Sequence, residues 1–336
     1  MSLNNNTAGM QQKAAGTLKD EEFLYYSRQL LLPDWSETQQ LLLKQKKLLV
    51  IGLGGLGCPA ATYLSGAGVG ELWLCDGDKV ELSNLPRQPL YRPADVGQNK
   101  AEAAKAALQA YNPYIRLTAF AQYADEALLH LLLPKVDFVL DCSDSQATKL
   151  LLNLLCRQYQ KAWAGASVVA YQGYSWLMPP TTTGGAQNTD HNIQHSIAPP
   201  TENKGADRAE NQQIAPVMGC LLCLGQDLPL TPGGCASQGV FAPLVATLAM
   251  QLSSGALHYL RGAQQKGWFL LYQHQQQNFV PLTITADENC AVCQGGALPA
   301  LPAYSSAAQS KTPQSSLPPQ AFIAVCQHTA QITRSF

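Results

Sequence analysis

A glycine-rich loop between a predicted strand and a predicted helix constrains this chain more than any other feature. The segment LLVIGLGGLGCPAATYLSGAG, which starts at Leu48, places Gly52, Gly54 and Gly57 directly after an apolar strand and before a helix. This is the context of the dinucleotide-binding fingerprint, because glycine lets the backbone approach phosphate and a helix N-terminus supplies unpaired N–H groups. The next predicted strand, ELWLC, ends at Asp76, 19 residues after Gly57, where an acid binds ribose hydroxyls. The sequence therefore predicts a nucleotide site, and these features alone are typical of a nicotinamide or flavin enzyme.

Strands and helices alternate along the first half of the chain. A helix is expected around NKAEAAKAALQAY, and it ends at Asn112-Pro113 because proline stops a helix. IRLTAFAQY and VDFVL read as strands, a leucine-rich helix follows, and AWAGASVVAYQGYSWLMP looks like a pair of strands. This alternation predicts an α/β fold with a Rossmann-like, mainly parallel sheet. With 46% apolar residues, the 336-residue chain can bury a substantial core.

The composition changes along the chain and suggests where the domain ends. Residues 1–19 are polar and are expected to be mobile, whereas residues 20–294 are predicted to form one domain. Within it, residues 181–216 are rich in Thr, Gly, Asn, Gln and Pro and read as a flexible insert. Residues 295–336 are rich in Ala, Pro, Ser and Gln and are predicted to form a low-complexity tail.

The charge balance excludes some classes of function. The chain has 22 basic and 23 acidic residues, so electrostatic capture of nucleic acid or of an anionic membrane is not its main role. The apolar segment Val240–Leu260 contains Pro243, Gln251 and His258, which favours a buried helix over a membrane-spanning one. No secretory signal is visible at the start, and a soluble, cytoplasmic protein is expected.

Four of the ten cysteines form two C-x-x-C pairs, Cys220/Cys223 and Cys290/Cys293. Two such pairs are the sequence form of a tetrahedral thiolate site, so a zinc site with four cysteine ligands is predicted. The 66 residues between the pairs exceed a zinc-finger spacing, and the metal would clip distant segments together near the C-terminal end of the domain. The alternative is two unrelated pairs of buried thiols.

Several charged and amide side chains turn the prediction away from hydride transfer. The loop after Asp76 carries Asn84, Arg87 and Gln88, and Lys100 opens the following helix. Two cations beside the phosphate loop are more than a pyrophosphate held by backbone would need.

Two carboxylates, Asp141 and Asp144, follow a buried strand at the edge where doubly wound sheets bind ligands. A carboxylate there, beside phosphates, is best explained as a ligand of Mg²⁺. The alternatives are ordinary: Lys100 could be a solvated helix residue, and Asp144 could be a helix N-cap.

Residues 25–294 resemble the MoeB/ThiF/HesA family, bacterial relatives of ubiquitin-activating enzymes, in the kind and order of their motifs. The matching segments are YSRQLLL, VIGLGGLG, AGVGELWLCDGD, LSNLPRQ, VGQNK, LDCSD, CLLC, GVFAP and CAVC. The resemblance implies an adenylyltransferase that uses ATP and Mg²⁺ to adenylate the C-terminal glycine of a ubiquitin-like sulfur carrier with a Gly-Gly end. It also implies a homodimer.

The expected roles follow from the chemistry and the resemblance together. The α-carboxylate of a carrier has a pKa of roughly 3.3–3.7, so it is already ionised and needs no general base. Lys100 and Arg87 are assigned to the phosphates and Asp144 to Mg²⁺. By resemblance, Arg28 reaches the phosphates from the partner subunit, like an arginine finger, and the motif residues Asn84 and Gln88 line the nucleotide pocket.

Cys235 lies in GGCASQGVFAP, between the two cysteine pairs. In the family a cysteine at the matching place can form a thioester-like or persulfide link with the carrier, and a sulfur-donor protein is then a further partner. The alternative is a buried structural thiol.

The chain departs from the family pattern at three positions. Ser145 stands where an asparagine is usual, Lys149 where an arginine is usual, and Pro86 where many relatives have glutamine. Lysine keeps the charge of arginine but loses its bidentate geometry. These changes bear on substrate identity and catalytic rate rather than on the nucleotide site.

The preferred function is activation of the carrier for the thiazole of thiamine. One alternative is the same reaction on the small subunit of molybdopterin synthase, as in MoeB. Another is a non-catalytic nucleotide-binding scaffold, although the presence of Arg28, Arg87, Lys100 and Asp144 together favours an active enzyme. A nicotinamide dehydrogenase is disfavoured by the cysteine pairs.

Overall fold

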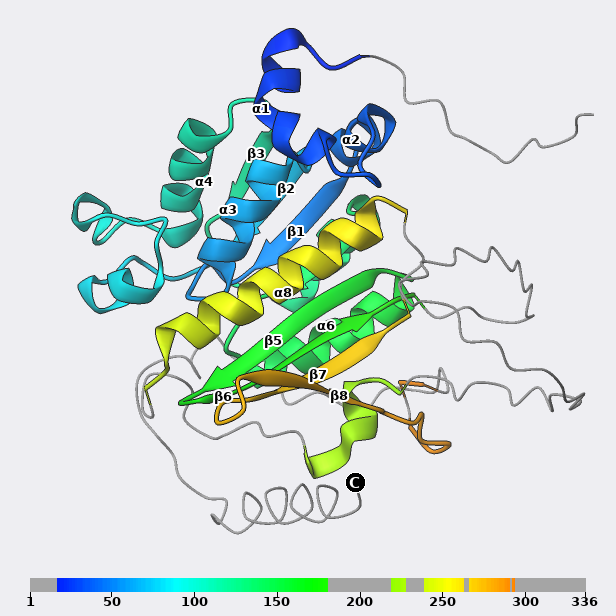
Figure 1. The fold of residues 1–336 in the computed structure, drawn as a ribbon. Coiled ribbons are helices and arrows are strands. Elements are labelled where there is room, and N and C mark those ends of the chain that lie inside the picture. The colour runs from blue at the N-terminus through cyan, green and yellow to red at the C-terminus, as the bar shows by residue number, and fades with distance from the viewer. Residues whose placement is uncertain (1–16, 181–218, 228–238, 263–265, 291, 294–336) are drawn as a thin grey trace, which may run out of the picture.

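The computed structural model describes residues 17–180, 219–227, 239–262, 266–290 and 292–293. These residues build an eight-stranded sheet, in the order β3-β2-β1-β4-β5-β6-β7-β8, with helices on both faces (Figure 1). The predicted insert at 181–216, the predicted tail at 295–336 and Cys235 lie outside the described residues, as do residues 1–16 of the predicted mobile start.

Five neighbouring strands of the sheet pair in parallel, and the remaining three are added through antiparallel pairings, so that β6 and β8 run opposite to the other six. The parallel strands are β1 (Lys47–Ile51), β2 (Glu71–Cys75), β3 (Arg116–Phe120), β4 (Phe138–Asp141) and β5 (Ala162–Val169). The strands joined by antiparallel pairings are β6 (Gln172–Met178), β7 (Trp268–Gln273) and β8 (Asn278–Leu282). The Rossmann-like, mainly parallel sheet is therefore confirmed, including the β5–β6 pair. The β7–β8 hairpin lies outside the segments for which the sequence predicts strands.

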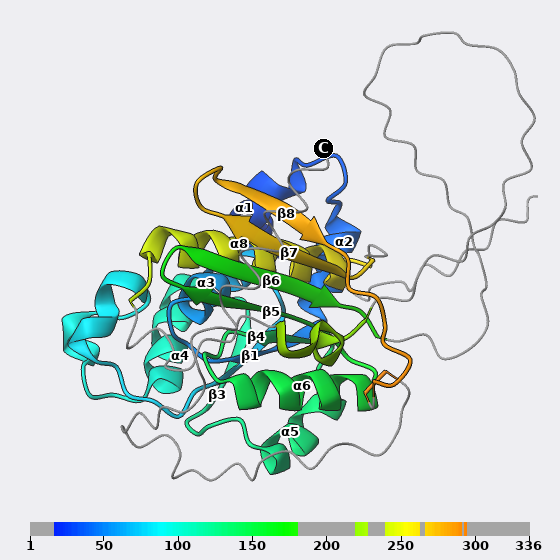
Figure 2. The same ribbon diagram turned by 90° about the horizontal axis from the view of Figure 1, so that it is seen from below.

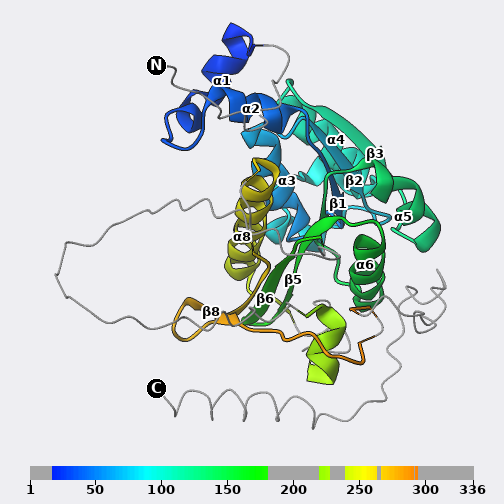
Figure 3. The ribbon, with the colours of Figure 1, turned by 90° about the vertical axis from the view of Figure 1, so that its right-hand side faces the viewer.

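Alternate residues of β1 enter two different layers of core, as the period of two in a strand requires. Leu48 and Val50 join the core beneath α3, α4 and α8, whereas Leu49 and Ile51 join the core beneath α5 and α6 (Figures 2 and 3). The helices are α1 (Asp20–Leu30), α2 (Glu37–Lys44), α3 (Gly57–Ala67), α4 (Lys100–Tyr111), α5 (Glu126–Leu132), α6 (Gln146–Gln158) and α8 (Ala242–Leu260). Short 3-10 turns cover Leu82–Arg87, Pro93–Asp95, Leu133–Lys135 and Leu221–Asp227.

The buried helix predicted over Val240–Leu260 is present as α8. Leu248, Ala249 and Leu252 are fully buried between α3 and the sheet. Among the described residues, no helix combines the length and the apolar character that crossing a membrane demands.

Gly52 and Gly57 approach each other closely within the loop between β1 and α3. Gly52 has φ of +84°, a left-handed conformation that side chains other than glycine rarely adopt. A Cβ at Gly57 would collide with the carbonyl oxygen of Gly52. The two glycines therefore let the strand turn directly into the helix and leave the N-terminus of α3 open at the end of the sheet.

Candidate functional site

Three loops meet at one end of the parallel strands, which we call the carboxyl edge: residues 52–57 after β1, 76–78 after β2 and 142–144 after β4. They meet because β2, β1 and β4 are neighbours in the sheet and point the same way. A Cβ at Gly52 would lie 2.8 Å from the carbonyl oxygen of Cys142, so the first and third loops are in direct backbone contact. Open α/β sheets bind their ligands at this edge.

Asp76 ties the second loop to the glycine loop. Its Oδ2 accepts the backbone N–H of Leu53 at 2.6 Å, and its Oδ1 accepts that of Asp78 at 2.8 Å. Burial raises the pKa of Asp76 above its ordinary value, against the lowering effects of Lys100 and of the two N–H groups. Each carboxylate oxygen has two lone pairs, so these two bonds do not use the full acceptor capacity of Asp76.

Lys100 begins α4 and lies against the carboxyl edge. Its Nζ donates to Asp78 Oδ2 at 3.0 Å, and Tyr123 donates to Asp78 Oδ1 at 2.6 Å. Burial alone would raise the pKa of Asp78, but the bonds from Tyr123 and Lys100 lower it overall. Lys100 is only 7% exposed, so it is not a solvated helix residue. Sequence reasoning missed Tyr123, which no motif marks.

The 3-10 turn Leu82–Arg87 brings the LSNLPRQ motif to the glycine loop. Asn84 and Gln88 are buried. The Nε2 of Gln88 is 3.7 Å from the position of a Cβ at Gly54, and its buried Oε1 has no partner in the described part of the chain. Arg87 is half-buried, with its Cγ 3.6 Å from the position of a Cβ at Gly55. A buried amide oxygen without a partner is what a site for a hydrogen-bonding ligand offers.

The two carboxylates after β4 differ in their surroundings. Asp141 is fully buried and pairs with Lys149 at 3.0 Å, so it is not open to a metal. Asp144 is exposed and has no partner among the residues that the structure describes. The cap of α6 is Ser145, whose Oγ accepts the N–H of Thr148 at 3.2 Å, so Asp144 is not the N-cap. Only Asp144 of the pair therefore remains available to a cation at this edge.

Arg28 lies apart from the other predicted site residues of its own chain. It is exposed on α1, and its neighbour Gln29 donates to the carbonyl of Ala67, at the C-terminal end of α3. The glycine loop is at the other end of this 11-residue helix, ~16 Å away at 1.5 Å per residue. Figure 1 shows α1 at the end of the sheet opposite the carboxyl edge.

The two C-x-x-C pairs come together into one cluster. The Sγ atoms of Cys220 and Cys290 are 3.6 Å apart, and those of Cys223 and Cys293 are 3.4 Å apart. All four Sγ atoms lie within 4.8 Å of one another, so the alternative of two unrelated pairs does not hold. A tetrahedral zinc with Zn–S bonds of about 2.3 Å needs sulfur–sulfur edges of about 3.8 Å, which fits this set of donors.

The cysteine cluster is remote from the carboxyl edge. It packs on Leu154, and Arg157 donates to the carbonyl oxygen of Cys293 at 2.6 Å. Both side chains belong to the second half of α6, whereas Asp144 precedes the first residue of that helix. Four protein thiols around one point leave no open position for a substrate, as in structural rather than catalytic zinc sites.

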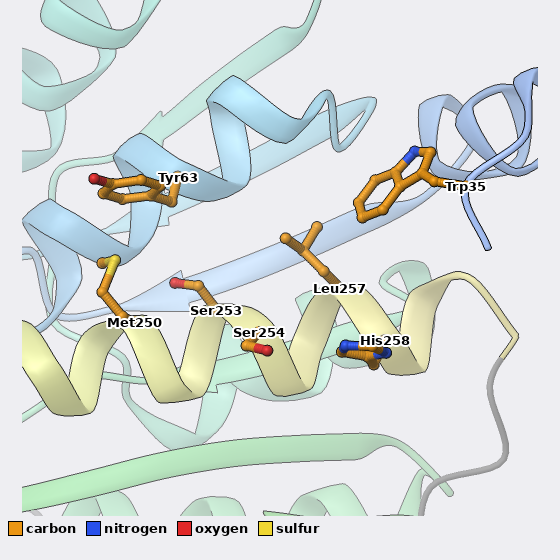
Figure 4. Close-up of a pocket in the computed structure, with 7 residues that line it drawn as sticks. All are labelled: Trp35, Tyr63, Met250, Ser253, Ser254, Leu257 and His258. Carbon is orange, nitrogen blue, oxygen red and sulfur yellow. The ribbon is translucent and has the colours of Figure 1, made fainter. Parts of the chain in front are cut away.

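A shallow pocket of about 220 Å³ lies elsewhere, between α3, α8 and Trp35 (Figure 4). Its lining is mostly apolar and contains none of the predicted site residues. The lining residues are Trp35, Tyr63, Met250, Ser253, Ser254, Leu257 and His258.

Curated relatives carry names that match the enzyme class predicted from the sequence. The chain is 32% identical over 279 residues to the sulfur carrier protein ThiS adenylyltransferase of Escherichia coli K12, covering 83% of this chain and 98% of that protein. It is also 32% identical over 278 residues to the molybdopterin-synthase adenylyltransferase of the same strain, covering 82% and 98%. The adenylyltransferase and sulfurtransferase MOCS3 of Drosophila virilis is 40% identical over 190 residues, 55% of this chain but only 40% of that longer protein. These names support an adenylyltransferase.

A solved structure gives the fold and a family model gives the family. The crystal structure of E. coli MccB with ATP has a TM-score of 0.60 and 21% identity, covering 80% of this chain and 74% of that one. This likeness confirms the fold. The model of the ThiF family matches residues 26–292, which is most of the chain. The chain therefore belongs to the ThiF family, as the order of its motifs predicts.

Proposed function

We propose that this chain uses ATP to adenylate the C-terminal glycine of a ubiquitin-like sulfur carrier that ends in Gly-Gly. The observation that supports the proposal is that Arg87 and Gln88 lie against the glycine loop. Lys100 bonds to Asp78 in the neighbouring loop, and the exposed Asp144 follows Ser143, which contacts Gly52. The adenylyltransferase names of the full-length relatives support it. A dehydrogenase would need neither the two cations nor the exposed carboxylate.

The chemistry at this edge is charge neutralisation and positioning. An oxygen of the carrier carboxylate attacks the α-phosphorus of ATP, and pyrophosphate leaves. The ammonium group of Lys100 has three N–H donors and uses one of them to bond to Asp78, so two remain for phosphate oxygens. Arg87 and the N-terminus of α3 add positive potential. Asp144 would hold Mg²⁺, which supplies further positive charge to the phosphates. Such preorganised charge is the main source of catalysis when no proton must move.

Alanine at Lys100 or at Asp144 is expected to lower carrier-dependent ATP–pyrophosphate exchange by roughly 10²–10³, because each removes charge stabilisation at a reacting phosphate. Lys105→Ala is the matched control, since Lys105 lies on α4 and has no ion-pair partner in the described region. Circular dichroism checks that each variant is folded. Near-normal exchange by either site variant would contradict the assignment of phosphates and metal. If the wild-type protein shows no exchange with any Gly-Gly carrier, the non-catalytic scaffold remains as the alternative.

A homodimer is part of the proposal. Arg28 lies beside the C-terminal end of α3, and the glycine loop is at the other end of this helix, which is ~16 Å long, so we assign Arg28 to the site of a partner chain. Large apolar side chains are exposed on and just after α1, with Leu24 and Leu31 each 74% exposed. A two-fold interface that covers them would be able to carry Arg28 to the partner's carboxyl edge.

Mixing inactive chains tests whether Arg28 acts in trans. Arg28→Ala and Lys100→Ala homodimers should each be inactive. After subunit exchange in equal amounts, half of the dimers combine the two chains, and one of the two sites in each combines an intact Lys100 with an intact partner Arg28. We expect about a quarter of wild-type exchange activity in this mixture. Activity no higher than that of the separate variants would contradict a role in trans. The control is the same mixing with Arg87→Ala in place of Arg28→Ala. Arg87 is assigned to the site of its own chain, so this second mixture should stay inactive.

The carrier for the thiazole of thiamine is the preferred substrate, with the molybdopterin-type carrier as the alternative. The preference depends on the motifs, because identity to the two E. coli enzymes is 32% in both cases. A thiamine-type enzyme also gives Cys235 a role: its thiolate would attack the carrier's acyl-adenylate and release AMP. A sulfur-donor protein would then act on the linked carrier.

Offering both carriers with ATP and a sulfur donor, and reading the products by intact mass, tests the preference. We expect the thiamine-type carrier to be adenylated preferentially and to become linked to the enzyme. Cys235→Ser should block the link and sulfur transfer but leave adenylation unchanged, because adenylation uses only the carboxylate of the carrier. Preferential use of the molybdopterin-type carrier, with Cys235→Ser fully competent, would overturn the preference.

We also propose one structural zinc per chain, held by Cys220, Cys223, Cys290 and Cys293. Two backbone N–H groups bond to this cluster, from Asp287 to Cys223 Sγ and from Cys293 to Cys290 Sγ, both at 3.4 Å. Such outer bonds orient thiolate ligands around a metal.

Metal analysis should find about one zinc per chain, and chelation should lower thermal stability more than nucleotide affinity, because the cluster is remote from the carboxyl edge. Cys223→Ser should lose zinc, whereas Cys156→Ala, a control within the core, should retain it. Native protein with no zinc and four free thiols at these positions would refute the proposal.

A further inference from the structure

A buried ion pair lies directly beneath the turn that carries Asp144. The side chains of Lys149 and Asp141 are 3% and 0% exposed, and Lys149 Nζ is 3.0 Å from Asp141 Oδ2. The same Nζ donates to the carbonyl oxygens of Ser143 at 2.7 Å and of Ala166 at 3.0 Å. All three N–H donors of the ammonium group are therefore used within the chain.

The other oxygen of Asp141 completes the arrangement. Asp141 Oδ1 accepts the backbone N–H of Ser143 at 3.0 Å and its hydroxyl at 2.6 Å. Both members of the ion pair thus bind Ser143, the residue that precedes Asp144. The backbone of Ser143 is in turn packed against Gly52, where an added Cβ would lie 2.9 Å from the nitrogen of Ser143. The turn has little freedom to move relative to the glycine loop.

Stability alone does not account for such a pair. Taking two charges out of water costs several kcal/mol per ion, and replacing a buried pair by apolar residues is often neutral or stabilising. Three of the bonds made by this pair go to Ser143. The next residue, Asp144, has an exposed carboxylate without a partner in the described region. The arrangement is therefore suited to fixing where that carboxylate points.

We propose that Lys149 is a positioning residue, which fixes the β4–α6 turn so that Asp144 meets the metal ion bound to the nucleotide. This inference rests on the proposed function. Lys149 itself touches neither metal nor nucleotide, because its three donors are occupied. It acts through the carbonyl of Ser143 and through Asp141, as outer residues act on metal ligands elsewhere.

Binding measurements on the full-length protein test this role apart from turnover. The affinity for ATP is measured by calorimetry, once with Mg²⁺ and once with chelator, and the ratio of the two is the metal-dependent gain. Lys149→Met should reduce that gain about 10-fold, the size usual for loss of a group behind a metal ligand. Affinity in chelator should stay unchanged. Lys149→Arg, which restores the charge, should recover most of the gain.

Two further variants separate positioning from a general loss of stability. Leu152→Ala removes a fully buried side chain from the same helix, so it should lower the melting temperature and leave the metal-dependent gain intact. The pair Asp141→Asn with Lys149→Met removes the uncompensated buried charge, which keeps the test usable if Lys149→Met alone does not fold. It should show the same loss of gain.

The outcomes are distinguishable. A folded Lys149→Met or double variant with the wild-type gain, in a protein where Asp144→Ala abolishes it, would overturn the positioning role and leave the proposed function standing. An equal loss of affinity with Mg²⁺ and with chelator would also overturn it, in favour of a purely structural role. Wild-type protein that binds no Mg²⁺–ATP would overturn the proposed function, and the inference with it.

Discussion

The close approach of Gly52 to the backbone of Cys142 and Ser143 is the contact on which the candidate site depends. It brings the loop after β1 against the turn after β4 with no side chain between them. Asp76 joins the loop after β2 to the same place through the N–H of Leu53. The three loops are therefore in direct contact, and Lys100 bonds to one of them through Asp78.

The fold could be predicted from the sequence wherever local pattern and tertiary packing agree. Short apolar runs predicted β1, β2 and β4. The segment NKAEAAKAALQAY and its stop at Asn112-Pro113 predicted α4, and a mixed apolar and polar segment predicted α8. The hairpin of β7 and β8 escaped prediction because its residues alternate weakly and its pairing partner, β6, is about ninety residues earlier in the chain. Spacing in the sequence carries no information about that pairing.

The sequence predicted which residues belong to the candidate site better than it predicted the contacts that they make. The C-x-x-C spacing identified all four clustered cysteines, and the loop motifs identified the side chains near the glycines. The sequence assigned Asp144 rather than Asp141 to Mg²⁺, but it did not predict that Asp141 is buried and paired with Lys149. Nor did it indicate that Tyr123 contacts Asp78. Such distinctions depend on which way each side chain leaves the turn, and a sequence pattern does not record that.

The cysteine cluster also has a consequence for how this part of the chain can change. A metal held by the four thiolates would close a loop that includes the 66 residues between Cys223 and Cys290. The entropy lost on closing a loop grows only with the logarithm of its length, and each doubling costs roughly 0.6 kcal/mol. Insertions or deletions between the two pairs would therefore barely loosen the closure. Evolution can rework the length of that segment while the ends stay clamped beside α6.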